Sequence, residues 1–281
     1  NEQASSKTVP QMGRRQRAEG GRKHKNQTMK QYEAVIETLK RLGGIATLGQ
    51  LNQEVFKIKD CKWGTKTPFA SIRRIVQERS EIYRVRPGLW ALTSLRKQLE
   101  ANGIIEEGNH NADSSIVKDF NHSYYQGLLL YVGNMNGFRT YAPGQDKNKK
   151  CVNVRLQDIC SLNAMPPFSY PEIVHRSSTI DVIWFSGNSL GTDLYMPRSF
   201  FEVEHSTDIQ NSLLKYNDLQ DFNADMYIVA DKRREEDFER KLRFSAFDSL
   251  RKKRRVKFLD YERLVDIYEA TTKISKLNIK L

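Results

Sequence analysis

The first part of the chain after residue 27 shows apolar residues at helical spacing. The segment TMKQYEAVIETLKRLGG predicts a helix that ends at the glycine pair, and ATLGQLNQEVFKI predicts a second, short helix. In KTPFASIRRIVQERSE, Thr67 is a suitable N-cap and Pro68 suits the first helical position. The segment IYRVRPGLWALT then predicts two short strands around a Pro-Gly turn. Residues 28–98 are therefore predicted to form three helices followed by a hairpin.

This order of elements is that of the winged helix, a variant of the helix-turn-helix. Its third helix would present outward side chains to DNA, because Arg and Gln can read base edges while Lys and Ser suit phosphate. The residues expected to contact DNA are Lys66, Ser71, Arg73, Arg74 and Gln77 on or beside this helix, with Arg84 and Arg86 on the wing. A winged helix that serves only as a protein-interaction module is the alternative.

The periodicity fades over residues 99–116, which are predicted to be a linker, and a second domain is expected over 117–281. Its predicted elements begin with a helix at about 119–133, stopped by Gly133, and the strand GFRTYAP. The strands TIDVIWFS and SFFEVEHS follow, separated by a turn-rich insert. A helix at about 208–222, the apolar strand ADMYIVAD, a helix, the strand VKFLDY and a final helix complete the chain. The predicted fold class is thus a two-domain α+β or α/β protein, with a winged helix and a mixed α/β core.

The strand SFFEVEHS contains two carboxylates on one face. Because side chains alternate along a strand, Glu202 and Glu204 lie on the same face, roughly 6.6 Å apart. A solvated sheet face is one interpretation, and a cation-binding site is the other.

Charge favours a polyanionic partner. The chain has 46 Lys and Arg against 34 Asp and Glu, for a net charge of +12, and such a balance is common in proteins that bind nucleic acid. Residues 1–27 contain seven basic and two acidic residues and almost no apolar side chains, which predicts a disordered basic tail. The tail could add phosphate contacts or be a plain solubilising extension.

Several classes of function are disfavoured by what the sequence lacks. No apolar run is long enough to cross a bilayer and no signal peptide is apparent, so a cytoplasmic protein is expected. The three cysteines form no CxxC pair, which argues against a structural zinc site. The motifs GxGxxG after a strand, HExxH and GxSxG are absent.

Residues 28–98 resemble the HARE-HTH winged-helix family, through GGIATLGQLNQEV, KTPFASIRRIVQERSEIYRV and GLWALT. That family is attached to chromatin factors and restriction enzymes. The resemblance covers about a quarter of the chain and implies binding to double-stranded DNA, with sensing of base modification as a further possibility.

The second domain resembles the PD-(D/E)xK restriction endonuclease-like superfamily, through Asp181 in IDVIWF and the triplet Glu202-Val203-Glu204. The resemblance implies Mg²⁺ as cofactor, held by Asp181, Glu202 and the carbonyl of Val203, with Asp181, Glu202 and Glu204 as catalytic residues. Glu204 stands where the motif has lysine, which leaves the role of general base in doubt. Lys215, on the following helix, is either a substitute for this lysine or a solvated residue.

Four further residues near these motifs have open roles. His122 and Gln126 could border the site or only pack, Glu172 could be an additional acid, and His205 is expected to be structural.

The sequence therefore predicts a Mg²⁺-dependent DNA endonuclease, most similar to a bacterial restriction enzyme that acts in the cytoplasm and at the nucleoid. Cutting both strands needs two sites or two successive nicks, so a homodimer on DNA is possible. The principal alternative is a non-catalytic DNA-binding regulator with a degenerate nuclease domain. A structural, protein-interaction role for both domains is a second alternative.

Overall fold

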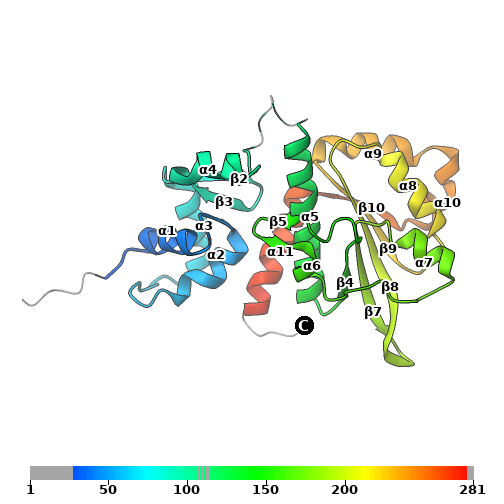
Figure 1. The fold of residues 1–281 in the computed structure, drawn as a ribbon, viewed down its shortest axis with the longest axis horizontal. Helices are drawn as coiled ribbons and strands as arrows, with labels where there is room; N and C mark the ends of the chain where they lie inside the picture. The colour runs from blue at the N-terminus through cyan, green and yellow to red at the C-terminus, as the bar shows by residue number, and fades with distance from the viewer. Residues whose placement is uncertain (1–27, 107, 109–110, 112–113, 277–281) are drawn as a thin grey trace, which may run out of the picture.

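A smaller helical part packs beside a larger part that is built around a five-stranded sheet (Figure 1). The computed structural model describes residues 28–106, 108, 111 and 114–276, so the predicted basic tail lies outside the described residues. The elements of the smaller part are α1 (Gln31–Arg41), β1 (Ile45–Thr47), α2 (Leu48–Glu54), η1 (Val55–Lys57), α3 (Pro68–Glu78), β2 (Ile82–Arg86), β3 (Leu89–Leu92), η2 (Thr93–Leu95) and α4 (Arg96–Ala101).

The smaller part contains the three predicted helices and the hairpin, with β1, η1, η2 and α4 in addition. Strand β1 pairs with β3, which gives an antiparallel sheet in the order β1-β3-β2. The sequence did not predict β1, because its three residues are too few to show an alternating pattern. Gly43 and Gly44 both have positive φ where the chain leaves α1, a conformation that glycine adopts without steric cost.

The larger part is a mixed α/β layer structure. Its elements are α5 (Ser115–Met135), β4 (Arg139–Tyr141), β5 (Lys150–Cys151), β6 (Val154–Arg155), α6 (Leu156–Ile159), α7 (Pro171–Ser177), β7 (Val182–Asn188), β8 (Gly191–Glu204), α8 (Ile209–Asp218), β9 (Asp225–Ala230), η3 (Lys232–Arg234), α9 (Glu235–Leu242), η4 (Ser245–Phe247), α10 (Asp248–Lys253), β10 (Val256–Asp260) and α11 (Tyr261–Lys276). The main sheet has the order β10-β9-β8-β7-β4. Strands β8, β9 and β10 are mutually parallel, while β7 is antiparallel to β8 and to β4.

Helices cover both faces of this sheet. Phe201 and Val203 of β8 pack in one hydrophobic cluster with residues of α5 and α11. Phe200, next to them along β8, packs in a second cluster with residues of α8, α9 and α10. The alternation of side chains along a strand accounts for this division, and it places Glu202 and Glu204 on the face that α8 covers.

The two parts share a hydrophobic core. Ile45, Val85 and Leu89 of the smaller part belong to the same buried cluster as the residues of α5 and α11. At the β2–β3 turn, the Tyr124 hydroxyl donates to the Pro87 carbonyl at 2.8 Å. A Cβ on Gly88 would lie 2.5 Å from the side chain of Val265, so this glycine allows the turn to pack closely against α11.

Three local predictions differ from the structure. Leu99 and Ile104, in the predicted linker, are buried in the shared core. Gly133 lies inside α5 rather than at its end. A Cβ there would lie 2.5 Å from the Trp184 indole nitrogen, so this glycine allows β7 to pack closely against the helix. The predicted insert between the two strands is the tip of the β7–β8 hairpin.

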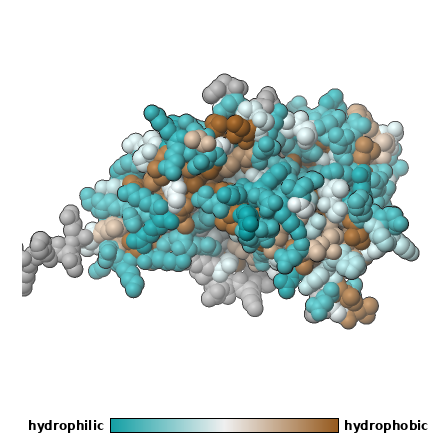
Figure 2. Space-filling model, in the orientation of Figure 1, coloured by the Kyte–Doolittle hydropathy of each residue, from teal (hydrophilic) through white to brown (hydrophobic). Residues whose placement is uncertain are grey.

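The surface in Figure 2 is mainly hydrophilic, with apolar atoms at the protruding hairpin tip, where Leu190 and Leu194 are exposed. Among the described helices, none combines the length and the apolar character that spanning a membrane requires.

Candidate active site

Strand β8 continues past the start of its neighbour β7, and the site forms at this overhang. Val182 is the first residue of β7 and pairs with Phe201, so the next residues of β8 have no strand partner on that side. The Asp181 carboxylate takes the place of the missing strand and accepts a hydrogen bond from the Val203 N–H at 2.7 Å. The Val203 carbonyl lies 3.2 Å from Nδ1 of His122, on α5. The Val203 carbonyl therefore faces the His122 side chain at the overhang rather than a neighbouring strand.

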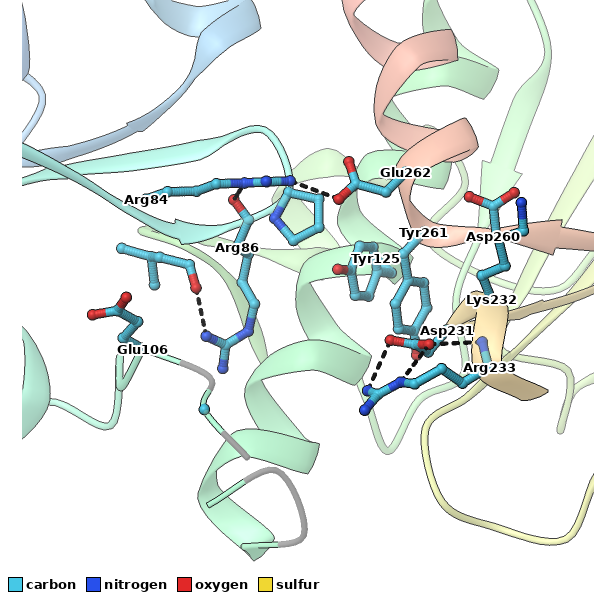
Figure 3. Close-up of a pocket in the computed structure, with 13 residues that line it drawn as sticks. Arg84, Arg86, Glu106, Tyr125, Asp231, Lys232, Arg233, Asp260, Tyr261 and Glu262 are labelled. Carbon is cyan, nitrogen blue, oxygen red and sulfur yellow. Dashed lines mark hydrogen bonds and ion pairs between the residues drawn. The ribbon is translucent and has the colours of Figure 1, made fainter. Parts of the chain in front are cut away.

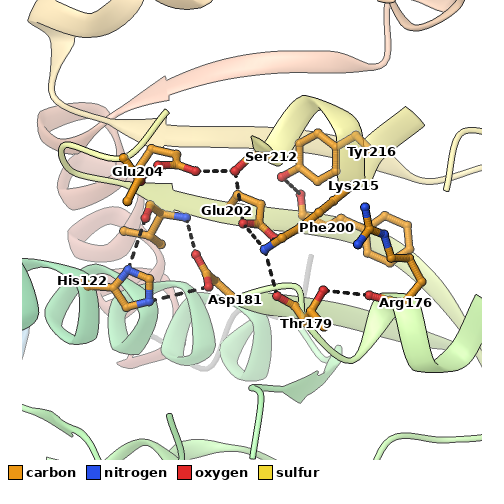
Figure 4. A network of polar contacts seen from close by, with 12 residues as sticks. His122, Arg176, Thr179, Asp181, Phe200, Glu202, Glu204, Ser212, Lys215 and Tyr216 are labelled. Atoms are coloured by element: carbon orange, nitrogen blue, oxygen red, sulfur yellow. Dashed lines mark hydrogen bonds and ion pairs between the residues drawn. The ribbon is translucent and has the colours of Figure 1, made fainter. Parts of the chain in front are cut away.

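Glu202 is a buried carboxylate that is paired with a lysine. The Lys215 ammonium, on α8, lies 2.9 and 3.0 Å from the two carboxylate oxygens and also donates to the Thr179 carbonyl at 3.1 Å. Burial raises the pKa of Glu202 well above its ordinary value, and the charge of Asp181 adds to the rise, while Lys215 opposes it. Figure 4 shows Lys215 directed at Glu202 from the neighbouring helix. The site therefore already stabilises positive charge next to Glu202.

Glu204 is fixed by two hydroxyl groups. Ser212 of α8 and Thr207 donate to its two carboxylate oxygens, and Ser212 also lies 3.2 Å from Glu202. Burial raises the pKa of Glu204 above its ordinary value, although the hydrogen bond from Ser212 opposes the rise. A carboxylate with a raised pKa and a fixed orientation is suited to accept a proton near neutral pH.

His122, Asp146 and Asp181 form a second group of potential ligands. Nε2 of His122 lies 3.7 Å from Asp146 and 3.6 Å from Asp181, and one ligand atom from each of the three residues lies within 4.8 Å of the others, close enough to hold a metal ion. Gln126 donates to Asp146 at 3.0 Å and to the Asp181 carbonyl at 3.1 Å. Residues at positions i and i+4 of α5 thus face the strand overhang together.

The ionisation of this group follows from its neighbours. Burial alone would raise the pKa of Asp146, but contacts with His122, Lys149 and Gln126 hold it well below its ordinary value. Burial alone would lower the pKa of His122, but the contact with Asp146 and the charge of Asp181 raise it. These contacts stabilise the ionised form of Asp146 and the protonated form of His122 relative to their other forms.

The structure brings together most of the residues that the sequence suggested for chemistry. Asp181, Glu202, Val203 and Glu204 meet at the overhang, and Lys215 joins them rather than pointing into solvent. The sequence did not point to Asp146 or to Ser212. Asp146 lies in the loop YAPGQDKNKK, whose pattern gives no signal, and Ser212 is one polar residue on an amphipathic helix.

The structure also places Glu172 and His205, whose roles the sequence left open. Glu172 is exposed on α7. His205 interacts with Asn121 of α5, with 3.2 Å between Nδ1 and the amide nitrogen.

The residues expected to contact DNA divide into two groups. Lys66, Arg74 and Gln77 are exposed and Ser71 is half-buried. Arg73 and Arg84 instead form ion pairs with α11, Arg73 with Glu269 and Arg84 with Glu262.

The expectation that Arg86 reaches DNA is wrong. Its side chain is only 2% exposed, and its guanidinium donates to Asn121 and to the carbonyls of Val85 and Ile105. The β2–β3 hairpin is packed against α5 and α11, so Arg86 joins the two parts of the molecule.

A hollow of about 780 Å³ lies where the two parts meet at the ends of β9 and β10. Figure 3 shows its walls: Arg84 and Glu262 on one side, the stacked rings of Tyr125 and Tyr261, and the loop that follows β9. The Tyr261 hydroxyl donates to the Glu204 carbonyl at 3.3 Å. The hollow is therefore adjacent to the carboxylate cluster, which consists of Asp181, Glu202 and Glu204.

Comparison with known proteins identifies the larger part. Neither the curated proteins nor the solved structures gave a match. A family model described as the type II restriction enzyme NmeDI C-terminal domain matches residues 104–280. This region is more than half of the chain, and it contains α5, the five-stranded sheet and the whole carboxylate cluster. The chain belongs to the NmeDI C-terminal domain family of type II restriction enzymes.

Proposed function

We propose that this protein is a DNA endonuclease that requires Mg²⁺ and cuts phosphodiester bonds at the β8 overhang. The observation that carries the proposal is the convergence of Asp181, Glu202 and Glu204 at one end of β7 and β8, within the region that matches a restriction-enzyme family. Buried carboxylates are costly unless a cation is nearby. Three of them at one sheet end are better explained by a cation-dependent reaction than by the stability of the fold.

The donor set fits a hard divalent cation. Asp181, Glu202 and the Val203 carbonyl would hold the ion, and all three supply oxygen, which Mg²⁺ prefers. When bound, the ion would lower the pKa of a water molecule and neutralise charge on the phosphate. His122 and Asp146 lie beside this set. A deprotonated His122 would add a nitrogen ligand, which suits Zn²⁺ and other transition metals better than Mg²⁺.

The chain's own residues would divide the remaining chemistry. Glu204, held by Ser212 and Thr207, would accept a proton from the attacking water. Lys215 would place a positive charge at the site. Glu204, the third residue of the triplet Glu202-Val203-Glu204, cannot supply that charge. The Lys215 ammonium reaches the carboxylates from α8 rather than from β8.

The smaller part would act as a winged helix of the HARE-HTH type that contacts DNA. Three helices followed by a hairpin and an antiparallel sheet support this assignment. The contacts would come from Lys66, Ser71, Arg74 and Gln77, because Arg73 and Arg84 are engaged with α11 and Arg86 is buried. A homodimer on DNA would bring two sites to the two strands.

The principal test compares the wild-type protein with Glu202→Gln and with Glu172→Gln. The second variant is the matched control, since Glu172 is an exposed glutamate on α7. Plasmid and genomic DNAs, methylated and unmethylated, are incubated with Mg²⁺ or with EDTA. We expect discrete fragments that need Mg²⁺, no change with the control, and a loss of roughly 10³-fold with Glu202→Gln. Binding of DNA without cleavage in any metal would instead support the non-catalytic regulator.

A metal titration would separate the two ligand sets. Isothermal titration calorimetry with Mg²⁺ and Mn²⁺, without DNA, is performed on the wild type, Glu202→Gln and Asp146→Asn. We expect Glu202→Gln to abolish Mg²⁺ binding and Asp146→Asn to weaken mainly Mn²⁺ binding. The reverse result would assign the ion to His122, Asp146 and Asp181.

A further inference from the structure

The direction of the strands places one of two basic runs beside the carboxylates. Strands β8, β9 and β10 are parallel, so their last residues lie at one edge of the sheet, where Glu204 pairs with Ala230 and Ala230 with Asp260. The run Lys232-Arg233-Arg234 follows β9 directly. Three consecutive cationic side chains are therefore adjacent to the strand end that carries Glu204.

Contacts connect this run to the carboxylate cluster. Arg234 donates to the Thr207 carbonyl at 2.6 Å, and the Thr207 hydroxyl donates to Glu204. Arg234 also lies 3.7 Å from Asp237. With its side chain only 18% exposed, Arg234 fixes the loop to the site rather than extending into solvent.

Lys232 and Arg233 line the hollow next to the cluster. Within the described part of the chain, the side chain of Lys232 has no hydrogen bond or ion pair, and the pair that Arg233 forms with Asp231 at 2.9 Å leaves the arginine side chain 71% exposed. The guanidinium binds Asp231 through Nε and Nη2, and because the side chain is largely exposed it can approach a phosphate in the hollow without leaving this pair.

Three of the four carboxylates that line the hollow are paired with an arginine. Glu106 has Arg96, Asp231 has Arg233 and Glu262 has Arg84, whereas Asp260 accepts the neutral Arg263 N–H. Lys232 adds a cation whose side chain has no carboxylate partner among the described residues, and Arg233 remains largely exposed, so this loop is the part of the wall best suited to a phosphate.

The longer basic run lies elsewhere. Residues 251–255, RKKRR, precede β10, so they lie at the edge of the sheet opposite to Glu204. Lys253 and Arg255 contact Gln220 and Phe222, before the start of β9. The more conspicuous run in the sequence is therefore remote from the site.

We propose that Lys232 and Arg233, in a loop fixed by Arg234, bind DNA phosphates adjacent to the bond that is cut. The inference rests on the proposed nuclease function and adds positioning residues to it. Lys and Arg both form charge-assisted hydrogen bonds with phosphate, and contacts of this kind fix the register of the DNA without reading its sequence.

The test compares two double variants with equal change of charge. Lys232→Gln/Arg233→Gln removes the proposed contacts, and Lys252→Gln/Arg254→Gln removes two exposed cations at the opposite edge. Binding of a fluorescent 30-base-pair duplex is measured in EDTA at several NaCl concentrations, and cleavage of genomic DNA is measured with Mg²⁺. Thermal unfolding of each variant verifies that it is folded.

We expect the first variant to lower affinity roughly tenfold, and the slope of log K against log salt by about one to two, because each phosphate contact adds roughly 0.9 to the slope. Its cleavage rate at low DNA concentration should fall in proportion, and the control should stay within twofold of the wild type. The inference would be overturned by equal salt slopes for the first variant and the wild type, or by an equal loss of affinity in both double variants. In either case, cleavage by the wild-type protein would leave the proposed function intact. A wild-type protein that neither binds nor cuts DNA would overturn both.

Discussion

At the scale of the residue, the site depends on one short contact between helix and strand. Lys215 donates hydrogen bonds to both oxygens of the buried Glu202. The third residue of the triplet Glu202-Val203-Glu204 is a glutamate rather than a lysine. The positive charge thus comes from α8, which is the next helix along the chain after β8. One side chain stabilises a buried charge in the fold and supplies a cation to the proposed reaction.

Replacing Lys215 separates these two effects. We expect Lys215→Met to reduce Mg²⁺-dependent cleavage by about 10²-fold, since a donor aimed at developing charge is lost. It should also lower the free energy of unfolding by roughly 1–3 kcal/mol, because Glu202 loses a buried partner. Lys215→Arg, which keeps the cation, is the control for charge. Cleavage assays and urea denaturation measure the two effects, and full activity of Lys215→Met would exclude a role in the reaction.

At the scale of the element, α5 determines the shape of the site. The helix presents His122 and Gln126 to the overhang, and two of its glycines allow close packing behind them. A Cβ on Gly127 would lie 2.2 Å from the Cys151 Cβ, and Trp184 donates to the Leu129 carbonyl at 3.1 Å. Because glycine has no side chain, α5 can lie close to β5 and β7 at these two positions.

We expect Gly127→Ala to lower the melting temperature and the activity together. Overpacking costs about 1–3 kcal/mol, which outweighs the gain of about 1 kcal/mol from replacing glycine inside a helix. Gly64→Ala is the matched control, because nothing lies within 4 Å of a Cβ at that position. Calorimetry and the cleavage assay should show a change for Gly127→Ala alone. An unchanged melting temperature for Gly127→Ala would mean that α5 can shift freely.

The sequence predicted the elements that repeat a pattern and missed those that depend on packing across the chain. Alternation along β8 placed Glu202 and Glu204 on one face, and helical spacing located α1, α3 and α8. No local pattern could place Asp146 beside His122, because their contact depends on how a loop folds back on α5. The sequence could not predict the inward position of Arg86 for the same reason. Whether a strand residue is exposed depends on which element packs against it.

At the scale of the whole molecule, the two parts are fused rather than tethered. Ile45, Val85 and Leu89 share a core with α5 and α11, and the Thr47 hydroxyl lies 3.1 Å from that of Tyr268. Large apolar interfaces restrict the relative motion of domains. The predicted boundary at residues 99–116 therefore separates segments of sequence but not independent bodies.

We expect a single cooperative unfolding transition. Scanning calorimetry of the full chain should give equal calorimetric and van't Hoff enthalpies, because residues from both parts lose one core together. Two resolved transitions would show that the smaller part unfolds by itself. Tyr268→Ala, which removes contacts with α2, should shift the whole transition rather than split it.

The fused core also constrains how such an enzyme could acquire a new target. A domain can be exchanged by grafting where it is joined to the rest of a protein through an exposed linker that few contacts cross. Here a graft would have to reproduce the apolar surface that β2, β3 and their turn present to α5 and α11. If α3 reads DNA as proposed, new specificity would be accessible mainly through substitutions on its outward side, one side chain at a time, with the packing behind them left unaltered.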